Sequence, residues 1–93
     1  MRVEVSTQVS DFLRSLAPEP RKRIRKALRD LAADRGDILE LEHPLDGFYR
    51  LRIGRYRVIF YYAVEGAERV IRCDYGERRE LVYELFNDLI RGE

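Results

Sequence analysis

The feature that most constrains this chain is polar–apolar alternation in two neighbouring stretches separated by a glycine. Residues 48–53 (FYRLRI) and 56–64 (YRVIFYYAV) both alternate, and Gly54 and Arg55 lie between them. Alternation with a period of two is typical of half-buried β-strands. A two-residue loop with glycine in the first position predicts a hairpin with a type II′ turn. The sequence therefore predicts an antiparallel pair of strands over residues 48–64.

The two-residue loop also predicts the register of this hairpin, with Arg52 directly opposite Arg57. One face is then wholly apolar and is expected to face the core; its residues are Tyr49, Leu51, Ile53, Tyr56, Val58 and Phe60. The other face carries the charged residues; its residues are Arg50, Arg52, Arg57, Ile59 and Tyr61.

This second face is a candidate site for an anion. Arg52 opposite Arg57 is a like-charge pair, which destabilises a sheet by a few tenths to ~1 kcal/mol. No Asp or Glu lies between Gly47 and Glu65 to neutralise it. Guanidinium groups among aromatic rings suit a polyanion whose bases can stack. The alternative is that Asp74, or acidic residues of the last helix, pair with these arginines.

The N-terminal half predicts two helices after a short strand. Arg2–Val5 alternates like a strand, and an apolar stripe from Val9 to Leu16 predicts a first helix. Pro18 and Pro20 separate it from a second helix over about Arg21–Ala33, because proline is tolerated only in a first turn. Two short helices joined by a tight turn form an antiparallel helical hairpin.

The remaining segments complete a single α+β domain over residues 1–93. Residues 38–47 are expected to be a connector, 65–68 a turn, 70–75 a third strand of the meander, and a final helix begins at about 79. The predicted order is β-α-α-β-β-β-α, an antiparallel meander packed on the helical hairpin, with a C-terminal helix.

Composition excludes several classes of protein. The only cysteine, Cys73, and the only histidine, His43, cannot form an internal disulfide or a zinc site. No apolar run approaches the ~18 residues of a membrane span, and the N-terminus has no apolar signal core. We therefore expect a cytoplasmic domain without metal or cofactor. His43 lies beside a proline and is expected to be a loop residue.

Arginine dominates the positive charge, since all but two of the 18 Lys and Arg residues are arginines. Arginine is suited to bidentate phosphate contacts, although a bias in coding composition explains the ratio equally well. Six basic residues crowd the second helix: Arg21, Lys22, Arg23, Arg25, Lys26 and Arg29. They form either a solvated helix face or a surface for phosphates or an acidic partner.

A second basic segment marks the start of the last helix. Residues 76–83 read GERRELVY, with Arg78 and Arg79 at the junction between strand and helix. Helix N-termini attract phosphate through free N–H groups and the helix dipole. Tyr83 follows about one turn later and either packs at the margin of the apolar stripe or projects toward the arginine-bearing face.

Two motifs resemble those of the RelE/ParE superfamily of type II toxin–antitoxin toxins. They are LDGFYRLRIGRYRVIFYY at residues 45–62 and GERRELVY at residues 76–83. The resemblance covers essentially the whole chain. It implies the RelE-like fold, a cognate antitoxin as partner, and action on the ribosome and its mRNA. RelE-like members cut mRNA in the ribosomal A site without metal, through attack of a ribose 2′-hydroxyl on the adjacent phosphate.

Such a reaction needs a base for the 2′-hydroxyl, positive charge around the phosphorane and an acid for the leaving oxygen. By motif match, the resemblance implies catalytic roles for Arg57, Tyr83 and either Arg78 or Arg79. It implies RNA binding by Arg50 and Arg52, to which Arg55 in the hairpin loop is added. The alternative function is that of a ParE-like inhibitor of DNA gyrase, which is not an enzyme, or of an inactive family member.

Overall fold

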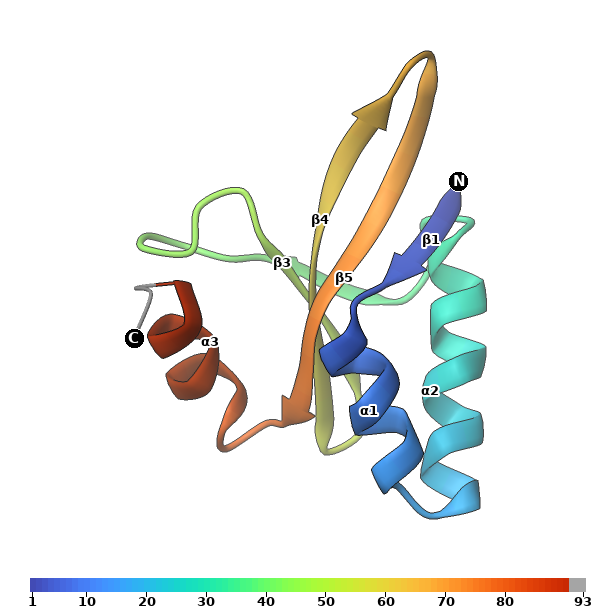
Figure 1. Cartoon of the computed structure of the whole chain (residues 1–93), viewed down its shortest axis with the longest axis vertical. Helices are drawn as coiled ribbons and strands as arrows, with labels where there is room; N and C mark the ends of the chain where they lie inside the picture. The colour runs from blue at the N-terminus through green and yellow to red at the C-terminus, as the bar shows by residue number, and fades with distance from the viewer. Residues whose placement is uncertain (91–93) are drawn as a thin grey trace.

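A five-stranded mixed sheet runs through the computed structural model, which describes residues 1–90 (Figure 1). The elements, in chain order, are β1 (Arg2–Val5), α1 (Thr7–Ser15), α2 (Pro18–Leu31), β2 (Asp37–Glu40), β3 (Tyr49–Ile53), β4 (Tyr56–Glu65), β5 (Glu68–Arg78) and α3 (Val82–Ile90). The strand order is β1-β5-β4-β3-β2. Neighbouring strands are antiparallel except β1 and β5, which are parallel. The predicted α+β class is confirmed.

The central hairpin has the predicted register. Tyr49 lies opposite Phe60 and Arg52 lies opposite Arg57. Gly54 has a φ of 58°, while Arg55 has a negative φ, as a type II′ turn requires. Because side chains alternate between the faces of a strand, this register sends the apolar residues and the arginines to opposite faces of the sheet.

The two faces of the sheet are covered by different helices, with α1 and α2 on one side and α3 on the other (Figure 1). Beneath α1 and α2, the predicted apolar face of the hairpin forms the main core, in which Leu51, Val58 and Phe60 are buried. A second, smaller cluster joins α3 to the opposite face; its buried residues are Leu45, Ile59, Val82 and Phe86. The arginine-bearing face is therefore partly covered.

Two sequence predictions about the strands are corrected. The expected connector over residues 38–47 contains most of the strand β2, which is short, lies at the sheet edge and buries no residue fully. With Ile38 alone half-buried, β2 has no alternating pattern to detect. The strand expected at 70–75 extends over Glu68–Arg78, because its pairing with β4 continues through charged residues.

The predicted helix bounds also change. α2 starts at Pro18 rather than Arg21 and ends at Leu31, so both prolines lie in its first turn. α3 starts at Val82 rather than near Arg79, because the Arg79 N–H still donates to the carbonyl of Arg55 across the sheet at 2.8 Å.

The apolar stripe expected on the last helix divides into a buried and an exposed part. Val82 and Phe86 are fully buried against the sheet. Three other members of the stripe are exposed by 37–53%; they are Leu85, Leu89 and Ile90. The sheet therefore covers only part of the apolar stripe of α3.

A side-chain amide extends the sheet where β1 stops. The Gln8 side chain donates to the carbonyl of Gly76 and accepts from the N–H of Gly76, both at 2.7 Å. Gly76 is buried under Phe12, and a Cβ on Gly76 would lie 2.9 Å from the Phe12 ring. Gln8 thus replaces the strand that β5 lacks at this point, and glycine leaves room for the ring.

We expect Gln8→Ala to lower the free energy of unfolding by about 1–3 kcal/mol, because it leaves a buried N–H and a buried carbonyl unpaired. The measurement is the midpoint of urea unfolding. Thr7→Ala, at the exposed neighbouring position, is the control. Equal midpoints for the two variants would show that the amide contributes nothing.

Candidate functional site

Arg57 is fixed at the end of the sheet where β3 turns into β4. Its guanidinium donates to the carbonyl oxygens of Gly54 at 2.8 Å and Tyr56 at 2.9 Å. Both acceptors are neutral, and the side chain is half-buried. Arg57 is thus held in place by the hairpin backbone while its positive charge stays uncompensated by these contacts.

Four other predicted site residues act electrostatically on Arg57. The pKa of the Arg57 guanidinium is lowered, with burial as the largest cause and the positive charge of Arg50 next. Tyr83 acts in the opposite direction and raises this pKa. Arg52 and Arg79 lower the pKa further through their charges. The fold thus gathers these residues, from β3, β4 and the segment leading into α3, around one guanidinium.

The acid that pairs with the β3 arginines is Asp37 of β2. Its carboxylate accepts from Arg52 Nε at 2.6 Å and from Arg50 Nη1 at 3.1 Å. The alternative that these arginines are paired within the fold holds for Arg50 and Arg52, but the partner is Asp37 and not Asp74 or an acid of the last helix. Burial alone would raise the pKa of Asp37, but the hydrogen bonds from Arg50 and Arg52 outweigh it and the pKa is lowered. Sequence analysis did not identify Asp37 because it did not identify β2, the strand that carries Asp37.

Tyr83 lies in the first turn of α3 and is half-buried. It packs against the small cluster that contains Val82 and Phe86. Tyr83 also raises the pKa of the Arg57 guanidinium through its charge. The predicted packing of Tyr83 at the helix margin is observed, and its projection toward the arginines stays a prediction.

The structure separates Arg78 from Arg79. Arg78 lies opposite Tyr56, so its side chain is on the face that α1 covers. There it lines a cleft together with Arg55. Arg79 lies past the end of β5 and acts on Arg57. The fold therefore brings Arg79, and not Arg78 or Arg55, to the group around Arg57.

The basic residues of α2 also fall into two groups, those with partners inside the fold and those exposed to solvent. The Arg21 guanidinium donates to the carbonyl oxygens of Leu13 at 3.0 Å and Leu16 at 2.7 Å, which satisfies the end of α1. Lys26 pairs with Asp30 at 3.0 Å. The other four are exposed: Lys22, Arg23, Arg25 and Arg29. Part of the basic helix thus serves the fold.

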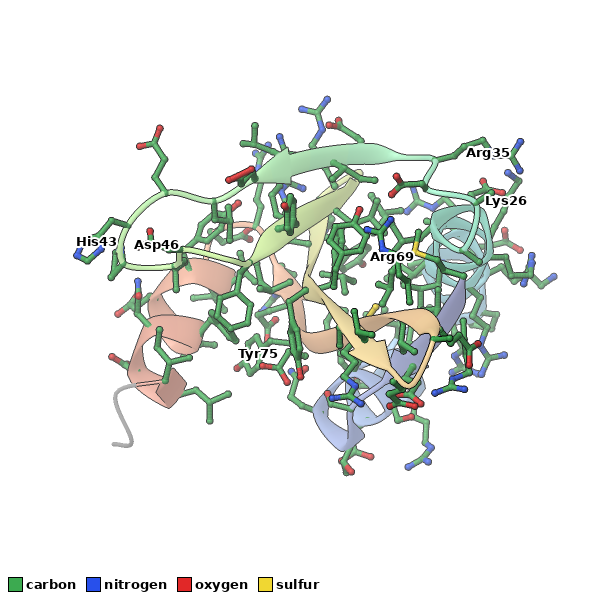
Figure 2. All side chains as sticks on the ribbon, turned by 90° about the horizontal axis from the view of Figure 1, so that it is seen from above. Lys26, Arg35, His43, Asp46, Arg69 and Tyr75 are labelled. Atoms are coloured by element: carbon green, nitrogen blue, oxygen red, sulfur yellow. The ribbon has the colours of Figure 1, made fainter. Side chains whose placement is uncertain are left out.

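Other reactive groups lie outside this cluster. His43 is an exposed loop residue 3.3 Å from Asp46, and Figure 2 shows both at the outer end of their loop. Burial raises the pKa of the Cys73 thiol to about 12, which makes it a poor nucleophile. Within residues 1–90, no group of three or more His, Cys, Asp and Glu residues is placed to hold a metal ion. No helix in that range is long and apolar enough to cross a bilayer.

Solved structures similar to this chain include a toxin and toxin–antitoxin complexes. A chain of the archaeal RelE–RelB complex from Pyrococcus horikoshii is 32% identical, with a TM-score of 0.60, over 84% of this chain and 93% of that chain. The RelBE2 complex from Mycobacterium tuberculosis gives a TM-score of 0.70 at 20% identity, over 84% and 96% of the two chains.

The YoeB/ParE toxin from Agrobacterium tumefaciens gives a TM-score of 0.68 at 14% identity, over 85% of this chain and 99% of that chain. No protein-family model and no curated protein sequence matches the chain. At these identities the Mycobacterium and Agrobacterium structures report on the fold, while the Pyrococcus complex is similar in sequence as well.

Proposed function

This chain belongs to the RelE/ParE superfamily of toxins, and we propose that it is an endoribonuclease that cleaves mRNA in the A site of the ribosome. The observation that carries the proposal is the arginine face of the β3–β4 hairpin, where Arg52 lies directly opposite Arg57 and two neutral carbonyls hold the Arg57 guanidinium. Positive charges gathered around one fixed guanidinium destabilise a fold, but they stabilise negative charge that develops on a bound phosphate.

The proposed reaction needs no group beyond the RNA, these side chains and solvent water. The ribose 2′-oxygen loses its proton and attacks the adjacent phosphorus, the bond from phosphorus to the 5′-oxygen breaks, and that oxygen gains a proton. The products are a cyclic phosphate and a 5′-hydroxyl. Arg57 and Arg79 stabilise the charge on the phosphorane, the Tyr83 hydroxyl carries out one of the two proton transfers, and solvent water carries out the other.

Arg50 and Arg52 bind the RNA backbone beside the reacting phosphate in this proposal. Their contacts with Asp37 hold the two guanidiniums in position on β3. Arg52 keeps 54% of its side chain exposed, which leaves donors free for a phosphate. Asp37 therefore orients Arg50 and Arg52, and its negative charge offsets part of their positive charge.

We further propose that a cognate antitoxin neutralises the chain in the cytoplasm. The Mycobacterium and Pyrococcus neighbours are complexes of a toxin with its antitoxin. An acidic segment would cover the arginines, and an apolar helix would add to the exposed part of α3 at Leu85, Leu89 and Ile90.

Induction of the chain without an antitoxin should stop protein synthesis before DNA synthesis. The two are followed by separate labelling, and purified chain is then added to ribosomes programmed with a defined mRNA. We expect cuts in the A-site codon, with cyclic phosphate ends, in the presence of EDTA. Replication that stops first, with translation continuing, would instead identify a ParE-like inhibitor of gyrase.

A further inference from the structure

A second group of arginines lies across the sheet from Arg57, in what we call the hairpin cleft. The cleft has a volume of about 310 Å3, and its walls include Phe12, Ser15, Arg55, Tyr56, Glu77 and Arg78. It lies on the side of α1, whereas the proposed reaction occurs on the side of α3. No role in the proposed cleavage uses it.

The floor of the hairpin cleft is aromatic and rigid. The rings of Phe12 and Tyr56 meet edge to face, with their centroids 5.9 Å apart. Tyr56 is 9% exposed, and Phe12 packs directly onto buried Gly76. The cleft therefore joins two arginines to an aromatic edge that a base or ribose can contact.

In the described part of the chain, Arg55 of the cleft lacks the carboxylate partner that most of the sheet arginines have. Arg2 and Arg72 pair with Glu65, Arg50 and Arg52 pair with Asp37, and Arg69 lies over the Tyr62 ring. Within residues 1–90, the guanidinium of Arg55 has no carboxylate within 4.0 Å and no hydrogen-bond acceptor. Arg78 has one carboxylate, Glu77, at 3.9 Å.

Another positive charge reaches the same hairpin from α2. A Cβ built on Gly54 would lie 3.5 Å from Arg23 Nη1, so the Arg23 guanidinium lies against the loop. Glu77 offsets only one of these charges. A cleft with uncompensated guanidiniums and an aromatic floor suits a phosphate joined to a nucleoside.

The two arginine groups are joined through the backbone. The Arg79 N–H donates to the carbonyl of Arg55 at 2.8 Å, and Arg79, which acts on Arg57, directly follows Arg78 of the cleft in the chain. We propose that the hairpin cleft binds a second phosphate of the same RNA strand, so that the strand crosses the tip of the β3–β4 hairpin. This inference rests on the proposed function, since it concerns the same RNA.

The test uses the full chain and a short single-stranded RNA with 2′-O-methyl groups, which cannot react. Binding is measured by fluorescence anisotropy across a salt series. Arg55→Gln with Arg78→Gln should weaken binding by about tenfold at low salt. It should also reduce the salt slope by about 0.7, the value for one lost phosphate contact on a single strand.

The matched control is Arg35→Gln with Arg69→Gln, which removes the same charge at two positions outside the cleft, both labelled in Figure 2. The control should bind with the wild-type salt slope. Urea unfolding of each variant establishes that it is folded, and the single variants Arg55→Gln and Arg78→Gln replace the double variant if it is not.

Two outcomes overturn the proposal and differ in what they say of the cleavage. If the cleft variant binds RNA as the control does, the cleft is no RNA site. The proposed function is not affected by that result, because the wild-type chain still binds RNA. The cleft is likewise no RNA site if the cleft variant loses affinity for an acidic peptide but binds RNA with the affinity of the wild type. If the wild-type chain binds no RNA at any salt concentration, both proposals fail together.

Discussion

Arg57→Ala should reduce single-turnover cleavage of mRNA on the ribosome by ~10² or more, the scale expected when one donor to a developing oxyanion is removed. The free energy of unfolding should change by less than about 1 kcal/mol. Burial and the charges of neighbouring arginines already disfavour the charged form of Arg57, as its lowered pKa indicates. Removing that charge offsets the loss of its hydrogen bonds to two carbonyls.

Arg69→Ala is the control for this experiment, because it removes an arginine from β5 far along the strand from the hairpin. It should cleave at the wild-type rate. A large fall in the melting temperature of Arg57→Ala, by more than about 8 °C for a domain of this size, would identify Arg57 as a structural residue.

Tyr83→Phe should lower the single-turnover cleavage rate by about 10²–10⁴, the range for loss of a general acid or base. The substitution keeps the ring, which packs against the cluster beneath α3, and removes only the hydroxyl. Binding to ribosomes and the midpoint of urea unfolding should therefore remain those of the wild type. The measurement separates binding from cleavage by varying the ribosome concentration.

Tyr75→Phe provides a matched control, since Tyr75 packs on the same cluster with its ring centroid 5.9 Å from that of Phe86. Figure 2 shows Tyr75 in the space between α3 and the sheet. If Tyr83→Phe and Tyr75→Phe both cleave at the wild-type rate, Tyr83 is a packing residue. The arginines would then carry the chemistry alone.

The β3–β4 hairpin is the part of the fold that the sequence predicts in most detail. A two-residue loop leaves one register, and that register assigns Leu51 and Val58 to the core and Arg52 and Arg57 to the other face. The prediction holds because it depends on residues that are neighbours in sequence.

The surroundings of the site depend on contacts between distant residues, and these were not predictable. Asp37 reaches Arg52 only because an edge strand without a pattern pairs with β3. Whether Arg78 or Arg79 faces Arg57 depends on an irregularity in β5, where Ile59 and Phe60 pair with Tyr75 and Cys73 and Asp74 is left over. One extra residue reverses which side chains face which side of the sheet.

The parallel pairing of β1 with β5 has a consequence for how the chain is made. β1 precedes its partner Val70–Cys73 by 68 residues, so it is synthesised well before that partner. Contacts over such sequence separations slow folding and keep early segments waiting for late ones. The β1 edge of the sheet that carries Arg57 therefore closes only after β5 has been synthesised, so the complete sheet is a late product of folding.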